Sequence, residues 1–306
     1  MNQGSTLLTV LRPMTNTPPV LKAGILGAIL AWPFLLVPSS AKANEKIDLS
    51  QPVSKSVPAI TGVYWSFDEL DGDSVDDGSA NDYRGTLDAG NGKQPRQIPG
   101  VTGEGGVFGS AIRLETAATE PGELGNPRIY VNLPQENRLG MTASSFTGGL
   151  WVRFDSTKAE GSQRVVLLDR GGFTMRLGVE GAGHYSLFLD RDAKGIWQVG
   201  FAAGNGSENE FALTETPDLG DGKWHHLGFN YLYREAGDYA VVLWLNGELL
   251  DEVAMKVEIS SGHADIAVHR FFVGDRTVPS FLSLFDGAVD DVFVTEGVYD
   301  FVPPRK

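Results

Sequence analysis

Residues 221–253 constrain the fold of this chain more than any other stretch, because they read as three strands in a row. Apolar side chains alternate with polar residues or glycine over most of residues 226–233. The same spacing of two recurs at Tyr239, Val241, Leu243 and Leu245. A period of two is typical of a pleated strand that buries one face. Asn246-Gly247 then separates two apolar runs, and tight hairpin turns favour this pair because both central residues take a positive φ. We therefore predict an antiparallel meander with a hydrophobic core built against it.

The rest of the sequence also favours short strands. The 38 glycines separate short apolar runs, and no segment keeps a helical period beyond a turn or two. The chain has no cysteine, but its 306 residues are enough to bury a core without disulfides. We predict an all-β protein in which two antiparallel sheets pack face to face as a β-sandwich. Besides the meander, we expect strands at residues 62–68, 109–114, 128–133, 146–154, 164–169, 173–179, 184–189, 197–202, 271–273 and 288–295.

The first 43 residues have the features of an export signal. A positive, polar lead ends at Lys22, residues 23–41 are uncharged and mostly apolar, and residues 41–43 read Ala-Lys-Ala. Small-x-small is the pattern after which a signal peptidase cuts. The alternative is an uncleaved membrane anchor, which two prolines in the apolar segment disfavour. We expect a signal peptide over residues 1–43 and a secreted or periplasmic protein, with Met14 as an alternative start.

The mature chain divides into a short linker and one domain. Residues 44–60 are polar and contain two prolines, so we interpret them as a linker. Residues 61–302 have the length of a single β-sandwich domain. The formal net charge is −14, and nucleic acids and anionic membranes are bound through clusters of Lys and Arg. We therefore expect neither nucleic acid as a partner nor stable membrane insertion after cleavage.

Several local patterns follow one another in the order of a known family. Tyr64–Asp68 precedes a loop rich in Asp, Gly and Asn, and Gly106–Leu114 leads from a turn into a strand. Trp244–Gly247 makes the hairpin, and residues 285–292 read Phe-Asp-Gly-Ala-Val-Asp-Asp-Val. Over roughly residues 60–301 the sequence resembles the laminin-G-like, concanavalin A-like jelly-roll superfamily in its bacterial secreted form. The resemblance implies a jelly roll, a fold that hosts lectins, adhesins, glucanases and lyases and so does not fix the function.

The same resemblance implies a structural calcium ion. In such proteins calcium often joins the loop after the first strand to an aspartate of the last strand. The matching residues are Asp68, Asp76, Asn81 and Asp290, and Asp77 remains an alternative to Asp76. Calcium prefers carboxylate, amide and carbonyl oxygens, which this loop offers. The alternative is an acidic, solvated loop without an ion.

Aromatic residues are the candidates for ligand contact. We interpret Trp65, Trp151, Trp224 and Trp244 as packing residues, because each lies in or at the end of a predicted strand. Trp197 directly follows a polar loop. An exposed ring there would offer an apolar surface for a sugar, so we predict Trp197 as a ligand-binding residue.

No motif predicts catalysis. Glycoside hydrolysis needs two carboxyl groups about 5–10 Å apart across the scissile bond. The nearest acidic set, residues 69–73, lies in a loop, and the adjacent His225 and His226 would point to opposite faces of a strand. We expect no catalytic residues and predict an exported binding protein for a glycan or cell-surface glycoconjugate. The alternatives are a polysaccharide-degrading enzyme of the same fold, either a glucanase or a lyase, and an adhesion module with a protein partner.

Overall fold

The structure, a computed structural model, describes residues 45–90, 93–99, 105–115, 127–133, 144–154, 163–170, 184–192, 194–205, 208–259, 270–273 and 286–304. The predicted export signal and the strand predicted at residues 173–179 lie outside the described residues. Within them, β-strands dominate, and the helix α1 (Val53–Ser56) spans a single turn. No helix in the described part of the chain is long and apolar enough to cross a membrane.

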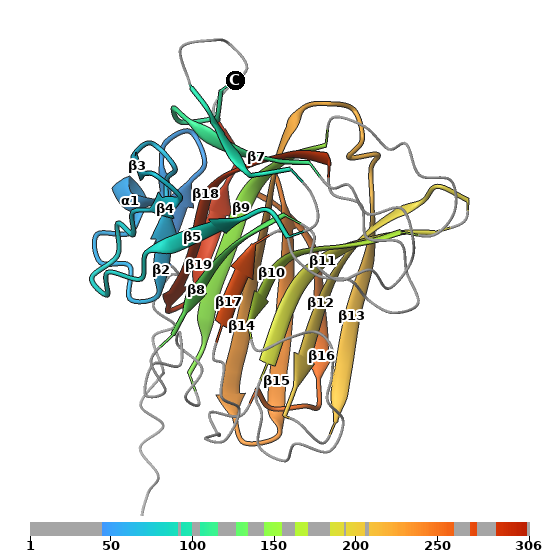
Figure 1. Cartoon of the computed structure of the whole chain (residues 1–306). Coiled ribbons are helices and arrows are strands. Elements are labelled where there is room, and N and C mark those ends of the chain that lie inside the picture. Colours follow the sequence, from blue (N-terminus) through green and yellow to red (C-terminus); the bar gives the residue numbers. More distant parts are fainter. Residues whose placement is uncertain are drawn as a thin grey trace, which may run out of the picture. The chain divides into compact units, whose positions relative to one another are not determined.

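The described strands form two large antiparallel sheets, as predicted (Figure 1). The nine-stranded sheet has the order β13-β12-β11-β10-β17-β8-β5-β4-β3, and the eight-stranded sheet has the order β16-β15-β14-β9-β18-β7-β6, with β2 paired to β18. The nine-stranded sheet comprises β3 (Leu70–Asp71), β4 (Ser74–Val75), β5 (Gly85–Asp88), β8 (Arg128–Asn132), β10 (Gln163–Arg170), β11 (His184–Arg191), β12 (Trp197–Gly204), β13 (Asn209–Thr216) and β17 (Arg270–Val273). The eight-stranded sheet comprises β2 (Val63–Trp65), β6 (Arg96–Ile98), β7 (Ala111–Glu115), β9 (Phe146–Phe154), β14 (Trp224–Glu235), β15 (Asp238–Leu245), β16 (Glu248–Met255) and β18 (Asp286–Glu296).

The meander predicted at residues 221–253 is confirmed as β14, β15 and β16. β14 pairs with β15, and β15 pairs with β16, both in antiparallel register. The turn at Asn246 and Gly247 has φ values of 52° and 80°, the left-handed conformation that this residue pair tolerates. We did not predict β13, because Asn209 and Glu210 at its start read as part of a polar turn.

The main core lies between the two sheets, where alternate residues of each strand point inward. Phe146 of β9 and Phe229 of β14 meet Tyr185 of β11 and Phe201 of β12, with ring centroids 4.8–5.8 Å apart across the gap. All four side chains are fully buried. Burying a large apolar side chain stabilises a fold by about 1.5–3 kcal/mol, so this aromatic group is a principal link between the sheets.

A smaller third layer covers the outer face of the eight-stranded sheet. β19 (Tyr299–Val302) pairs in parallel with β1 (Glu45–Asp48), and both lie outside the two large sheets. Their apolar side chains form a second hydrophobic cluster with outward-facing residues of the eight-stranded sheet. Its buried members are Ile47, Leu49, Val53, Val57, Ile60, Tyr64, Trp151, Phe293, Tyr299 and Phe301.

This third layer corrects the prediction that residues 44–60 are only a polar linker. Within the described residues 45–60, Ile47 and Val53 are 0% and 1% exposed. The Val53 N–H donates to Asp291 Oδ2 at 3.0 Å, which fixes α1 to β18. The prediction missed this contact because the apolar residues of the segment are widely spaced in a polar sequence. They are buried because they pack on Trp151 and Phe293, large apolar side chains on the outer face of the sheet.

Candidate functional site: a groove on the eight-stranded sheet

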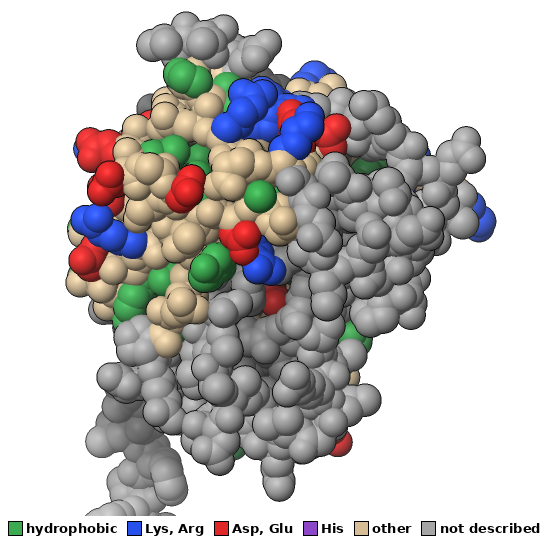
Figure 2. Space-filling view, viewed as in Figure 1, with side chains coloured by type: hydrophobic (Ala, Val, Ile, Leu, Met, Phe, Trp, Pro, Cys, Tyr) green, Lys and Arg blue, Asp and Glu red, His purple; other side chains and the backbone are tan. Residues whose placement is uncertain are grey.

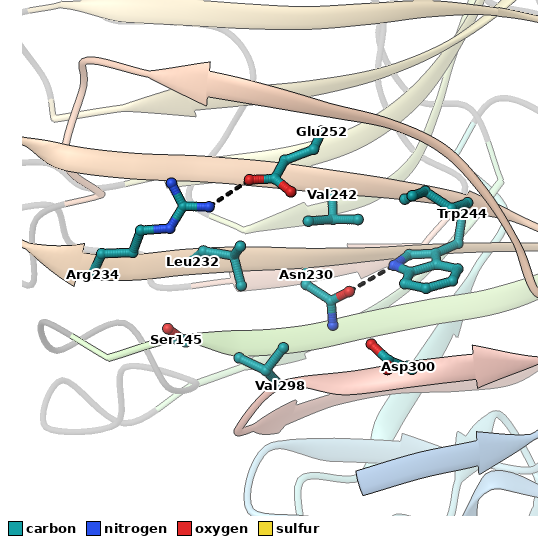
Figure 3. Close-up of a pocket in the computed structure, with 10 residues that line it drawn as sticks. Ser145, Asn230, Leu232, Arg234, Val242, Trp244, Glu252, Val298 and Asp300 are labelled. Carbon is teal, nitrogen blue, oxygen red and sulfur yellow. Dashed lines mark hydrogen bonds and ion pairs between the residues drawn. The ribbon is translucent and has the colours of Figure 1, made fainter. Parts of the chain in front are cut away.

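The described surface contains a groove of about 430 Å³ over β14, β15 and β16. Small-molecule sites are typically about 300–1,000 Å³, so the groove has room for a small ligand. Leu232 and Val242 form its floor, because the alternation that buries Tyr231 and Val241 points their neighbours outward. The groove is lined by Ser145, Asn230, Leu232, Arg234, Val242, Trp244, Leu249, Glu252, Val298 and Asp300 (Figure 3).

Trp244 stands at one end of the groove and is held by Asn230. The indole Nε1–H donates to Asn230 Oδ1 at 2.6 Å. The amide of Asn230 in turn donates to Thr147 Oγ1 at 2.7 Å and to the carbonyl oxygen of Tyr299 at 2.9 Å. Phe301 of β19 packs edge-on against the indole, with ring centroids 5.7 Å apart. The ring therefore has a fixed orientation, and its one polar group is already bonded within the protein.

Charged side chains close the other end of the groove. Arg234 of β14 forms an ion pair with Glu252 of β16, and its second terminal nitrogen lies 3.5 Å from Asp238. The hydrogen bond that Arg234 donates to the Glu252 carboxylate is the largest cause of a raised pKa for Arg234. Figure 3 shows this pair opposite Trp244, with Leu232 and Val242 between them and Asp300 along one side. The groove thus combines an apolar floor with a polar rim.

Two of the four predicted calcium ligands, Asp68 and Asp290, lie against the same tight turn. The Ser110 N–H donates to Asp68 Oδ1 at 2.9 Å, and the Phe108 N–H donates to Asp290 Oδ2 at 3.2 Å. A Cβ atom on Gly106 would lie 2.3 Å from Asp290 Oδ2, so only glycine permits this close approach. Burial, and then the charge of Asp291, raise the pKa of Asp290 to about 8.

The other two predicted ligands have partners elsewhere. Asp76 forms a 3.5 Å ion pair with the exposed Arg84. Asn81 donates from its amide to the carbonyl oxygens of Thr61 and Gly62 at 2.6 and 2.8 Å. Among the described residues, no group of three or more His, Cys, Asp or Glu side chains could hold a metal ion. The residues therefore fit a calcium site only in part.

Asp77, the alternative to Asp76, organises the acidic loop. Its carboxylate accepts hydrogen bonds from the backbone N–H groups of Tyr64, Ser79 and Tyr83 at 2.6–3.0 Å. It also accepts a bond from the Ser79 hydroxyl at 2.6 Å. A carboxylate that takes several backbone donors holds a loop together without a metal, because the bonds to a charged acceptor are strong.

Trp197 is not the exposed aromatic platform that we predicted. Its side chain is 3% exposed and packs in the main core against Phe154, with ring centroids 5.5 Å apart. The guanidinium of Arg191, on the neighbouring strand, lies 5.9 Å from its ring centroid. Residues 197–201 alternate, and Trp197 shares the inward face with Val199 and Phe201. The same alternation in β15 places Trp244 outward. This alternation could have identified Trp244 as the exposed tryptophan, but the prediction instead relied on the position of Trp197 beside a loop.

Basic side chains on the described surface are interspersed with acids. Lys93, Arg96 and Arg113 all lie within 4.0 Å of the Glu115 carboxylate. Figure 2 likewise shows Lys and Arg side chains next to Asp and Glu over the described part of one face. The bonds from Lys93 and Arg113 lower the pKa of Glu115 to about 2. Each of these bases therefore has an acidic neighbour, unlike the open clusters that bind polyanions.

Comparison with known proteins gives the class of this fold. Residues 125–298, more than half of the chain, match the family model Laminin_G_3, described as the concanavalin A-like lectin/glucanases superfamily. The chain therefore belongs to this family, and the resemblance drawn from its sequence is confirmed. No curated protein matches the sequence significantly.

Several solved structures share the fold at low sequence identity. One is the binding domain of botulinum neurotoxin DC in complex with rat synaptotagmin II, with a TM-score of 0.52, 11% identity, and coverage of 78% of this chain and 49% of that chain. Another, from work on ganglioside-dependent cell entry of botulinum neurotoxin type C, has a TM-score of 0.50, 13% identity, and coverage of 77% and 47%. The chain thus spans about half the length of these structures, and the likeness shows the fold alone.

Proposed function

We propose that this protein is an exported, non-catalytic binding module that recognises a glycan or glycoconjugate through the groove on β14, β15 and β16. The observation that carries the proposal is the fixed indole of Trp244 beside an apolar floor and a polar rim. A sugar ring has an apolar face of C–H groups and an edge of hydroxyls, and this groove presents the complementary pattern. The lectin-containing superfamily and the ganglioside-dependent toxin neighbour support the same class of ligand.

A binding experiment with matched tryptophan variants tests the proposal. Trp244 lines the groove, whereas Trp224, also half-buried on the same sheet, does not line it and lies under the guanidinium of Arg153 at 5.2 Å. We expect purified protein to bind glycans on an array, with the signal lost in Trp244→Ala and kept in Trp224→Ala. Absence of binding to every glycan, for protein that melts cooperatively, would refute the proposal.

A protein partner is the second candidate function. Phe211, Leu213 and Leu249 are 39%, 41% and 57% exposed, and they lie on β13 and β16, which contact each other at the edges of the two sheets. Exposed apolar side chains that gather at one edge mark a protein interaction surface when they form a continuous patch. Binding of protein receptors that survives Trp244→Ala but is lost in Leu213→Asp would favour this function over glycan recognition.

Calcium and export stay predictions within this proposal. A cation near Asp68 and Asp290 would offset the cost of burying Asp290 beside Asp291. The proposed groove does not include this turn, so calcium would act on stability rather than on ligand contact. N-terminal sequencing of protein from the culture medium or periplasm tests export, and we expect a mature chain that begins at Asn44.

A further inference from the structure

We infer that the groove selects a neutral pyranose ring over an acidic sugar. The inference rests on the proposed function and narrows it to one ligand class. It follows from three properties of the groove: its charge balance, the state of its arginine and the way Trp244 is presented.

The charge balance of the lining residues disfavours an anionic ligand. Glu252 and Asp300 are acids, and Arg234 is the single basic residue among the groove's lining. The protein as a whole carries a formal charge of −14, which adds a repulsive background for anions. A carboxylate-bearing sugar would therefore find no cation in the lining that is not already paired with an acid of the protein, whereas a neutral sugar needs none.

Arg234 is also committed to acids of the protein. Its guanidinium is bonded to Glu252 of β16, on the far side of β15, and lies 3.5 Å from Asp238 at the start of β15. Recognition of a sugar carboxylate normally uses a cation that can form a bidentate pair. To do this, Arg234 would have to break its pair with Glu252 and leave that acid facing the ligand.

Trp244 offers a surface without a hydrogen-bond donor. Its Nε1–H is bonded to Asn230 at 2.6 Å, and Asn230 is itself fixed by Thr147 and Tyr299. The indole can therefore contribute stacking against C–H groups but no polar contact. Hydroxyls at the edge of the ring would meet the exposed carboxylate of Glu252, which accepts hydrogen bonds from neutral donors.

Asn230 is the positioning residue of this arrangement. It is 1% exposed, so it acts from beneath the groove by fixing the indole and by tying β14 to β19. The wall of the groove at Val298 and Asp300 belongs to the connection into β19 and to β19 itself. The binding surface is thus complete only when the third layer is docked on the sheet.

The test uses pairs of glycans that differ in one acidic sugar. Lactose-terminated glycans and their 3′-sialylated counterparts are measured by array and by titration calorimetry against wild type, Glu252→Gln and Trp244→Ala. We expect wild type to bind the neutral member at least about tenfold more tightly, and Trp244→Ala to lose about tenfold or more for the neutral member. Glu252→Gln releases Arg234 and is expected to shift the ratio of the two affinities about tenfold toward the sialylated member.

Each outcome decides a separate point. Equal or tighter binding of the sialylated glycan by wild type would overturn the neutral-sugar inference and leave the proposed function standing. Glycan binding that Trp244→Ala leaves intact would overturn the placement in the groove. The Glu252 side chain is 49% exposed, so Glu252→Gln should fold even if Trp244→Ala does not. An unchanged preference between the two glycans in Glu252→Gln also counts against the inference. Binding to neither glycan set would refute the proposed function itself.

Discussion

The contribution of His226 to the stability of this protein should fall as the pH falls below about 6.5. Its side chain is 1% exposed and lies between the rings of Trp151 and Phe301, whose centroids are 5.4 and 4.8 Å away. Among the described residues, Nδ1 of His226 has no hydrogen-bond partner. Burial lowers the pKa of His226 to about 3, because the charged imidazolium would lose its hydration in the apolar surroundings.

The sign and size follow from proton linkage. An unfolded histidine has a pKa of about 6.5, so between pH 6.5 and 3 the unfolded chain binds a proton that the folded chain does not. The free energy of unfolding therefore falls by up to about 1.4 kcal/mol per pH unit in this window, or about 2–3 kcal/mol between pH 6.5 and 4.5. Asp290 and Asp291 act in the opposite direction, because burial raises the pKa of the first to about 8 and of the second to about 6.

A difference between two proteins separates the histidine from these carboxylates. The free energy of unfolding is measured by urea titration from pH 7.5 to 4.5 for wild type and His226→Leu. The difference between them should shift by about 2–3 kcal/mol in favour of the variant as the pH falls. His225→Gln is the matched control for replacing a histidine of this strand, because that ring contacts Asp221 at 2.9 Å and not Trp151 or Phe301. A wild type–His226→Leu difference that is constant across this range would show that His226 is not held neutral.

Three further perturbations test other parts of the structure. Ile47→Ala should lower the free energy of unfolding by about 2–4 kcal/mol in urea titration, because β1 belongs to the second cluster, whereas the exposed Lys46→Ala should change it by less than about 0.5 kcal/mol; equal effects would refute docking of this segment. Asp77→Ala should lower the free energy of unfolding by about 2–4 kcal/mol in the same titration, because the backbone N–H groups bonded to its carboxylate lose their acceptor. Asp76→Ala removes one exposed ion pair and should lower it by less than about 1 kcal/mol. A larger loss at Asp76 than at Asp77 would contradict the conclusion that Asp77 organises the acidic loop. Millimolar calcium should raise the melting temperature in scanning calorimetry relative to chelator, and Asp290→Asn should reduce that shift; identical melting in calcium and chelator would make the calcium prediction wrong.

The alternation of apolar residues predicted most of the sandwich. The strands predicted at residues 146–154, 164–169, 184–189, 197–202 and 288–295 occur within β9, β10, β11, β12 and β18. Side chains along a strand point alternately to its two faces, so the spacing of apolar residues shows which face of each strand is buried. The Asn246-Gly247 turn was equally visible because its φ values restrict the residues that can occupy it.

The site depended on register, which the sequence does not show. Asn230 lies opposite Val242, and Gly228 lies opposite Trp244, so the bond between Asn230 and the indole crosses from one strand to the next. Neither Asn230 nor Trp244 alone indicates a binding site in the sequence, and Trp244 was interpreted as a packing residue. Arg234 and Glu252 come from strands that are neighbours of β15 on opposite sides, and only the assembled sheet brings them together.

The sequence by itself determined that this chain forms two pleated layers around an apolar core, because the period of its apolar residues leaves no other way to bury them. It did not determine that residues 45–60 dock on the outer face of a sheet, since that contact joins β1 to β19, at opposite ends of the described chain. Nor did it determine which aspartate of the acidic loop takes the backbone donors, or that a groove opens beside β19. These features depend on tertiary structure because each is a contact between residues far apart in sequence, and a local pattern carries no record of its distant partner.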